Sequence, residues 1–227
     1  MTSDNVLFSF SGLFGVPVKV NQSLFVLVAM LFGFVGVAGG NVDSIALLLI
    51  FLLISIYLHE LGHALGAHSQ RVRVNEIVLH GGGGYCSHAI AGPKENLVLI
   101  AAGPAVNLAL WLAAGPVSNI VLALGGDTPF VESVASEILF FGQINLWLLI
   151  FNMIPVIPLD GGRLFYLGLW WRLPRDTAMK ITGLVGLIIS ILWIPAAVVA
   201  FFYLGFVLFF FPSIGDNWRR FKGEMLE

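Results

Sequence analysis

The sequence predicts an all-α membrane protein: a core of six transmembrane helices with a small membrane-associated β-hairpin between the second and the third. Of the 227 residues, 58% are hydrophobic and 11% are charged, which is low for a soluble domain. Since one crossing takes about 20 apolar residues, this composition suffices for about six crossings in a single polytopic domain, residues 1–227. The formal charge of −2 predicts no nucleic-acid partner, and the single cysteine, Cys86, excludes an intramolecular disulfide.

The first three crossings are recognised by their lack of charge. Residues 24–40 form the first, and the third lies within 96–124, where Pro116 is expected to bend the helix or end it early. The second begins at Ile45 and reaches polar sequence only near Gln70, so it contains ionisable residues.

The remaining crossings follow a short acidic loop. The fourth is predicted within residues 138–159 and is interrupted late by Pro155 and Pro158. Residues 181–211 are too long for one crossing, and they predict a tight pair of crossings turned at Pro195.

The basic residues support this count, because alternating crossings place every lysine and arginine on one side. The positive-inside rule makes that side the cytoplasm, so both termini of this multi-pass protein are expected there, with the cell membrane as its location in a prokaryote. These residues are Lys19, Arg71, Arg73, Lys94, Arg163, Arg172, Arg175, Lys180, Arg219, Arg220 and Lys222.

The second crossing carries the chemistry. His59 and His63 are four residues apart, so on a helix both imidazoles can reach one metal ion, while Glu60 projects nearby without needing to bind it. The H-E-x-x-H pattern is typical of zinc metalloproteases, in which the glutamate is the general base. A chance match is disfavoured, because burying these groups in hydrocarbon costs several kcal/mol unless they are paired or ligated.

A catalytic zinc needs a third protein ligand. His68, His80 and His88 lie in a polar segment and are expected to be ordinary solvated side chains. Asp160 follows a run, Asn152 to Leu159, whose prolines interrupt regular helix. Its carboxylate either turns toward the metal or is a helix-terminal group reaching water.

Three separated motifs resemble the site-2 proteases, a family of intramembrane zinc metalloproteases. They are His59-Glu60-Leu61-Gly62-His63, Ala102-Gly103-Pro104-Ala105-Val106-Asn107, and the Asn-x-x-Pro-x-x-Pro-x-Asp-Gly run from Asn152 to Gly161. The resemblance implies a six-helix core in which His59, His63 and Asp160 ligate one Zn²⁺ per chain and Glu60 is the catalytic base. It implies that Asn152 hydrogen-bonds the oxyanion or the substrate backbone, although an interhelical hydrogen bond explains Asn152 equally well.

Asn107 is interpreted first as a helix-packing residue. Members of the family often carry a PDZ domain or paired CBS domains, and neither is predicted here.

The predicted function is therefore hydrolysis of peptide bonds in or near transmembrane segments of membrane-protein substrates. The site is expected in the cytoplasmic half of the lipid bilayer, because His63 lies about 12 Å along the helix from Arg71. The alternative is an intramembrane metal-ion transporter, which would use Glu60 as a ligand or not at all.

A substrate helix must unwind before it is cut, and its freed backbone groups need partners. Residues 75–80 and 85–90, joined by four glycines, predict a hairpin that could pair with the substrate by strand addition. An ordinary glycine-rich loop explains this stretch equally well.

Overall fold

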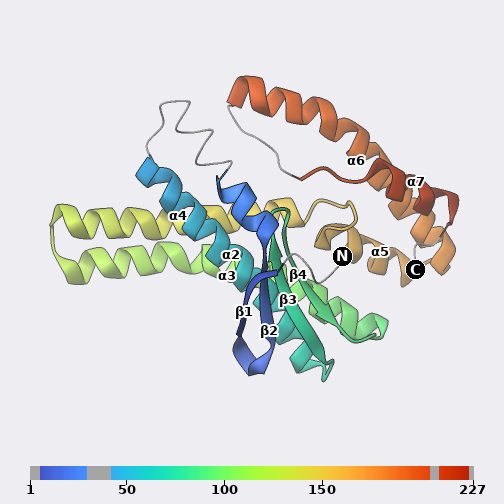
Figure 1. The fold of residues 1–227 in the computed structure, drawn as a ribbon, viewed down its shortest axis with the longest axis horizontal. Helices are drawn as coiled ribbons and strands as arrows, with labels where there is room; N and C mark the ends of the chain where they lie inside the picture. The colour runs from blue at the N-terminus through green and yellow to red at the C-terminus, as the bar shows by residue number, and fades with distance from the viewer. Residues whose placement is uncertain (1–5, 30–41, 205–209, 225–227) are drawn as a thin grey trace. The chain divides into compact units, whose positions relative to one another are not determined.

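The computed structural model of the chain describes residues 6–29, 42–204 and 210–224 (Figure 1). It divides into two compact units, Met1–Ile150 and Phe151–Glu227. The described part of the first unit contains a sheet and three long helices, and that of the second contains a loop and three further helices. The protein is thus mostly helical with a small sheet, as predicted.

The sheet has four strands within the described residues, in the order β1-β2-β3-β4. Both β1–β2 and β3–β4 are antiparallel, whereas β2 and β3 are parallel, with Val18 opposite Ile77. The predicted hairpin is confirmed as β3–β4, while β1 and β2 were not predicted. The strands are β1 (Val6–Ser11), β2 (Pro17–Asn21), β3 (Val74–His80) and β4 (Gly83–His88).

The turn of the β3–β4 hairpin depends on glycine. Gly83 has φ of +124°, a conformation that residues with a Cβ rarely adopt. A Cβ at Gly81 would lie 2.5 Å from the carbonyl oxygen of Ser23, so the turn can approach that backbone only without a side chain.

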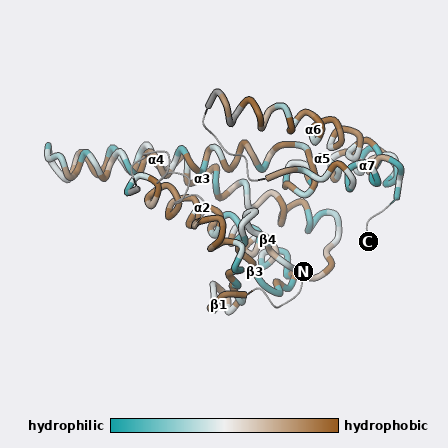
Figure 2. Tube along the Cα trace, turned by 45° about the horizontal axis from the view of Figure 1, so that its top comes forward, coloured by the Kyte–Doolittle hydropathy of each residue, from teal (hydrophilic) through white to brown (hydrophobic). Residues whose placement is uncertain are grey.

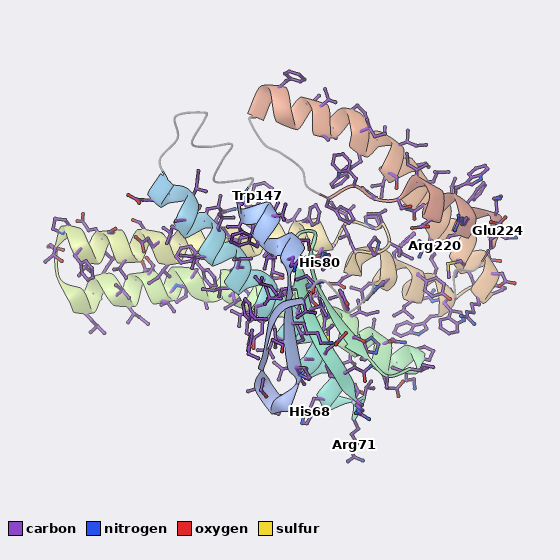
Figure 3. All side chains as sticks on the ribbon, in the orientation of Figure 1. His68, Arg71, His80, Trp147, Arg220 and Glu224 are labelled. Atoms are coloured by element: carbon purple, nitrogen blue, oxygen red, sulfur yellow. The ribbon has the colours of Figure 1, made fainter. Side chains whose placement is uncertain are left out.

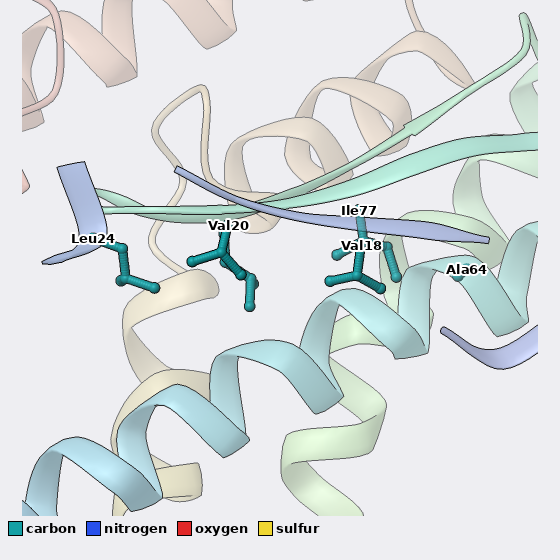
Figure 4. Close-up of a cluster of buried hydrophobic side chains, with 6 residues drawn as sticks. Val18, Val20, Leu24, Ala64 and Ile77 are labelled. Carbon is teal, nitrogen blue, oxygen red and sulfur yellow. The ribbon is translucent and has the colours of Figure 1, made fainter. Parts of the chain in front are cut away.

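The sheet packs on helix α2 (Val42–Ser69) through one apolar cluster (Figure 4). Val18 and Ile77 are at most 1% exposed, and Ala64 of α2 closes the cluster from the helix side. Lys19 and Glu76 form an ion pair of 2.6 Å between β2 and β3. Because Ala64 adjoins His63 in sequence, this packing brings the sheet beside the H-E-x-x-H segment.

Helices α2 and α3 (Pro93–Gly125) approach closely because glycines line their contact. A Cβ at Gly62 would lie 2.7 Å from the Ala102 carbonyl oxygen, and one at Gly66 would lie 3.0 Å from Cα of Leu99. Small residues of this kind let helix backbones come together in a membrane. The same close contact between the helices places α3 beside the two histidines of α2.

Helix α3 continues through Pro116 to Gly125, so of the two effects expected of Pro116, a bend or an early end, the early end is wrong. Helix α4 (Pro129–Asn152) then packs against it. The buried Ser118 hydroxyl donates to the Ala135 carbonyl at 3.0 Å, and Gly142 leaves room for the side chain of Ala114. The two helices are therefore joined by both polar and small-residue contacts.

The second unit begins with the end of α4, which stops at Asn152 as predicted. After a loop come α5 (Asp160–Trp170), α6 (Arg175–Leu204) and the amphipathic α7 (Ile214–Lys222). α7 packs on α6, where the buried Asn217 amide donates to the Ser190 hydroxyl at 3.2 Å. The indole of Trp193 donates to the Phe210 carbonyl at 2.8 Å.

Among the described residues, four helices are long and apolar enough to cross a membrane: Asp43–Ser69, Pro93–Gly125, Pro129–Asn152 and Arg175–Val199 (Figure 2). The chain is thus an integral membrane protein. Most of the predicted first crossing, residues 24–40, lies outside the described residues. The predicted turn at Pro195 is wrong, because α6 continues through this proline. Membrane helices tolerate proline where neighbouring groups satisfy the freed backbone carbonyl.

Candidate active site

Three ionisable side chains of α2 meet on one face of the helix. The donor atoms of His59, Glu60 and His63 all lie within 4.8 Å of one another. Each residue is at most 6% exposed, although the helix around them is strongly apolar. Their convergence is the one predicted from the four-residue spacing of the histidines.

Each imidazole is held by its Nδ1 atom. His63 Nδ1 lies 2.9 Å from the Leu99 carbonyl oxygen, and His59 Nδ1 lies 2.6 Å from Oδ1 of Asn107. A backbone carbonyl only accepts, so Nδ1 of His63 carries the proton and Nε2 keeps its lone pair. The Nε2 atoms of the two histidines face each other at 3.1 Å.

This arrangement fits a zinc ion. Two tetrahedral Zn–N bonds of about 2.0–2.1 Å hold their nitrogens about 3.3 Å apart, close to the 3.1 Å between the two Nε2 atoms. Metal-ligating histidines also commonly donate their other ring N–H to an oxygen, as both Nδ1 contacts here allow. The donor set therefore suits a metal better than it suits a purely structural hydrogen bond.

Two glycines form the walls of this site. A Cβ at Gly103 of α3 would lie 2.5 Å from Nε2 of His63 and 3.0 Å from Cε1 of His59. A Cβ at Gly84 of β4 would lie 2.7 Å from Cγ of Glu60. The absence of side chains at these two positions gives the imidazoles and the carboxylate their space.

Cys86 lies on β4 near Glu60. Burial raises the pKa of its thiol to about 12, and the negative charge of Glu60 adds to the shift. The thiol therefore stays protonated at neutral pH, a form that is a poor metal ligand.

The other histidines lie elsewhere. His68, near Arg71 at the end of α2, is exposed and stacks on Phe14 with 4.4 Å between the ring centroids (Figure 3). His80 accepts from the Gly82 N–H at 3.1 Å, and burial lowers its pKa. His88 contacts the Ala89 carbonyl at 2.8 Å.

Asp160 and Asn152 belong to the second unit. Asn152 is the last residue of α4, and the buried Asp160 is the first residue of α5. The loop between them folds back on the start of α5, so a Cβ at Gly161 would collide with the Met153 backbone and one at Gly162 with the Val156 backbone. The local backbone thus requires both glycines that follow Asp160.

Sequence reasoning missed three contacts of the site. Asn107 was interpreted as a packing residue, yet its Oδ1 contacts Nδ1 of His59. Gly84 was assigned only to a hairpin turn, and Asn145, which bonds Asn107 at 2.8 Å, was not singled out. A polar residue within an apolar helix is the signal that could have drawn attention to Asn145.

Comparison with known proteins gives a consistent result. Residues 113–193 match the model of peptidase family M50. "Putative zinc metalloprotease sll0528" of Synechocystis sp. is 35% identical over 169 residues, covering 70% of this chain and 43% of the relative. "Putative zinc metalloprotease Rip3" of Mycobacterium tuberculosis is 39% identical over 127 residues, covering 54% and 31%.

The fold is similar to that of a solved structure, the site-2 protease from Methanocaldococcus jannaschii. The TM-score is 0.61 at 21% identity, covering 96% of this chain and 93% of that one. The chain spans less than half the length of the two metalloproteases it matches above.

These comparisons agree with the family resemblance that the three motifs carry. The match to zinc metalloproteases implies a zinc ion, and the cluster of His59, Glu60 and His63 is a possible site for it.

The close approach of Gly103 to the two histidine rings can be tested by substitution. We expect Gly103→Ala to displace both imidazoles and to lower zinc retention at least about tenfold, as second-layer changes around metal ligands commonly do. Zinc would be measured by elemental analysis of the purified variant.

Gly115→Ala is the matched control, because a Cβ at this position of the same helix meets no atom within 4 Å. Equal zinc contents in the two variants would contradict the assigned role of Gly103.

Proposed function

We propose that the protein is an intramembrane zinc metalloprotease that hydrolyses peptide bonds in or near transmembrane segments of membrane proteins. The observation that carries the proposal is the pair of Nε2 atoms of His59 and His63, facing each other at 3.1 Å within an apolar helix and beside a carboxylate. The relatives' names support the same chemistry.

In this proposal His59, His63 and Asp160 hold the zinc ion. Asp160 is included because two histidines leave a catalytic site one protein ligand short, and because it is the acidic residue of the Asn152–Gly161 motif. The ion supplies Lewis-acid polarisation of the scissile carbonyl and lowers the pKa of water at its open position.

Glu60 acts as the general base. It takes the proton of the attacking water and passes it to the amine that leaves when the peptide bond breaks. The Gly84 wall lies against the Cγ of Glu60 and restricts where its carboxylate can point. We assign Asn152 the hydrogen bond to the oxyanion or the substrate backbone.

The transporter alternative receives no support. The two relatives described above are named as metalloproteases, and the part of the chain that the structure describes contains one cluster of metal-ligating side chains, whereas transport usually needs successive sites.

The roles of Glu60 and Asp160 can be separated. Glu60→Ala should abolish turnover yet retain zinc, because its role is proton transfer, whereas Asp160→Ala should lose both zinc and activity. The assay is zinc-dependent cleavage of single-crossing membrane peptides by purified protein in detergent, with metal content measured in parallel.

Wild type and a Gly115→Ala control should both cleave. Loss of zinc from Glu60→Ala together with its retention in Asp160→Ala would reverse the two roles, and absence of cleavage by zinc-loaded wild type would refute the proposed function.

We propose an even number of crossings, with both termini in the cytoplasm. The pairing of β2 with β3 in one sheet supports an even number of crossings between these strands, because paired strands lie on the same side of the membrane. One of them is α2, and the other is the first crossing expected from the sequence, residues 24–40. The one-sided distribution of the basic residues supports the orientation.

Site-specific tags test this topology. Tags at either terminus and near Lys94 should be accessible from the cytoplasm, and a tag near Asp127 should be accessible only from the opposite side. Protection of either terminus in protease-accessibility measurements would contradict this topology.

We propose further that an unwound substrate pairs with β4. Within the described residues β4 is an edge strand, and its Gly84 lies beside Glu60. A hydrogen-bonded pair normally flanks a two-residue hairpin loop, so the alternating pattern directs the N–H groups of Gly84 and Cys86 away from β3. Strand addition there would bring the substrate backbone next to the proposed base.

Removing one outward N–H tests strand addition. Cys86→Pro should slow cleavage of membrane substrates about fivefold, which corresponds to the loss of one hydrogen bond, without changing zinc content. Proline is tolerated where an edge N–H faces away from the sheet.

Cys86→Val is the matched control, because it alters the side chain and keeps the N–H. Equal cleavage rates for the proline and valine variants would rule out pairing at this edge.

A further inference from the structure

A buried chain of hydrogen bonds runs from α4 to the proposed zinc ligand His59. Asn145 of α4 donates through Nδ2 to the Phe141 carbonyl at 2.9 Å and to the Ser55 hydroxyl at 3.0 Å. Asn107 of α3 donates through Nδ2 to Oδ1 of Asn145 at 2.8 Å, and Oδ1 of Asn107 lies 2.6 Å from Nδ1 of His59. Ser55, Asn107 and Asn145 are each 0% exposed.

The hydrogen bond between Asn145 and the Phe141 carbonyl fixes which groups donate and which accept in this series. The Phe141 carbonyl can only accept, so the Asn145 amide must turn its NH₂ group toward it and its oxygen toward Asn107. Asn107 must then donate to that oxygen and present its own oxygen to His59. Consequently His59 holds its proton on Nδ1, which leaves the lone pair of Nε2 directed at Nε2 of His63.

We propose that Asn145 is a positioning residue that fixes the metal-binding tautomer of His59 through Asn107. The inference rests on the proposed function, because the tautomer matters only if His59 ligates zinc. Without Asn145, the Asn107 amide can rotate by half a turn and present its NH₂ group to Nδ1. His59 would then hold its proton on Nε2, where the proton competes with the metal.

His63 provides an internal comparison. Its Nδ1 is held directly by the Leu99 carbonyl, which cannot reverse its polarity. The two ligands therefore reach the same tautomer by different means, and only that of His59 depends on side chains that can rotate.

The test measures the zinc dissociation constant of purified protein in detergent by competition with a chromophoric chelator, together with the absorption spectrum of the Co²⁺-loaded protein. We expect Asn145→Leu to weaken zinc binding about 10- to 100-fold, the range found for partners of metal-ligating histidines, and to change the Co²⁺ spectrum.

The matched control is Ser118→Ala. It also removes a buried hydrogen bond between α3 and α4, of 3.0 Å, but one with no connection to His59. Its zinc affinity and Co²⁺ spectrum should stay like those of wild type. Asn145→Ala repeats the measurement should the leucine variant fail to fold.

A rescue variant separates positioning from packing. In the Asn107→Asp, Asn145→Leu double variant the carboxylate at position 107 accepts from His59 in either orientation, so zinc affinity should recover to within a few-fold of wild type. A merely structural loss would not be rescued by this second substitution.

Zinc affinity of the Asn145 variants equal to that of Ser118→Ala, or no recovery in the double variant, would overturn the inference. Failure of wild type to bind zinc would instead overturn the proposed function.

Discussion

The structure depends on one constraint: two imidazoles and a carboxylate are buried within an apolar helix. Each polar atom kept from water needs a partner, so α3 must come close enough for the Leu99 carbonyl and the Asn107 amide to reach the histidine rings. That approach is possible because Gly62 and Gly66 remove the side chains that would hold the helices apart. Local polar chemistry and helix packing thus impose the same geometry.

The sheet serves the same constraint from the other side of α2. Its apolar face covers the helix next to His63, and Gly84 of β4 approaches Glu60 more closely than any residue with a side chain could. The site is therefore enclosed by a helix on one side and by a strand on the other. The helix orients the histidines, while the strand limits the carboxylate.

Local sequence signals predicted the elements that depend on local chemistry: the apolar helix around His59, the end of α4 at Asn152 and the glycine-linked hairpin. Strand β1 was missed although Phe and Ser alternate within it, because that run is short and its partner β2 gains stability from a strand far along the chain. The Asn107–Asn145 bond joins residues 38 positions apart, which periodicity alone cannot reveal. The prediction of a turn at Pro195 was wrong because the effect of a proline in a membrane helix depends on neighbouring groups.

The parallel pairing of β2 with β3 also sets an order of assembly. β2 ends at Asn21 and β3 begins at Val74, so a ribosome has to synthesise all of α2 before the two strands can meet. β4, whose Gly84 lies beside Glu60, is synthesised later still. During synthesis the H-E-x-x-H segment is therefore made before the strands that enclose it, and His59, Glu60 and His63 become enclosed only after β3 and β4 have packed on α2.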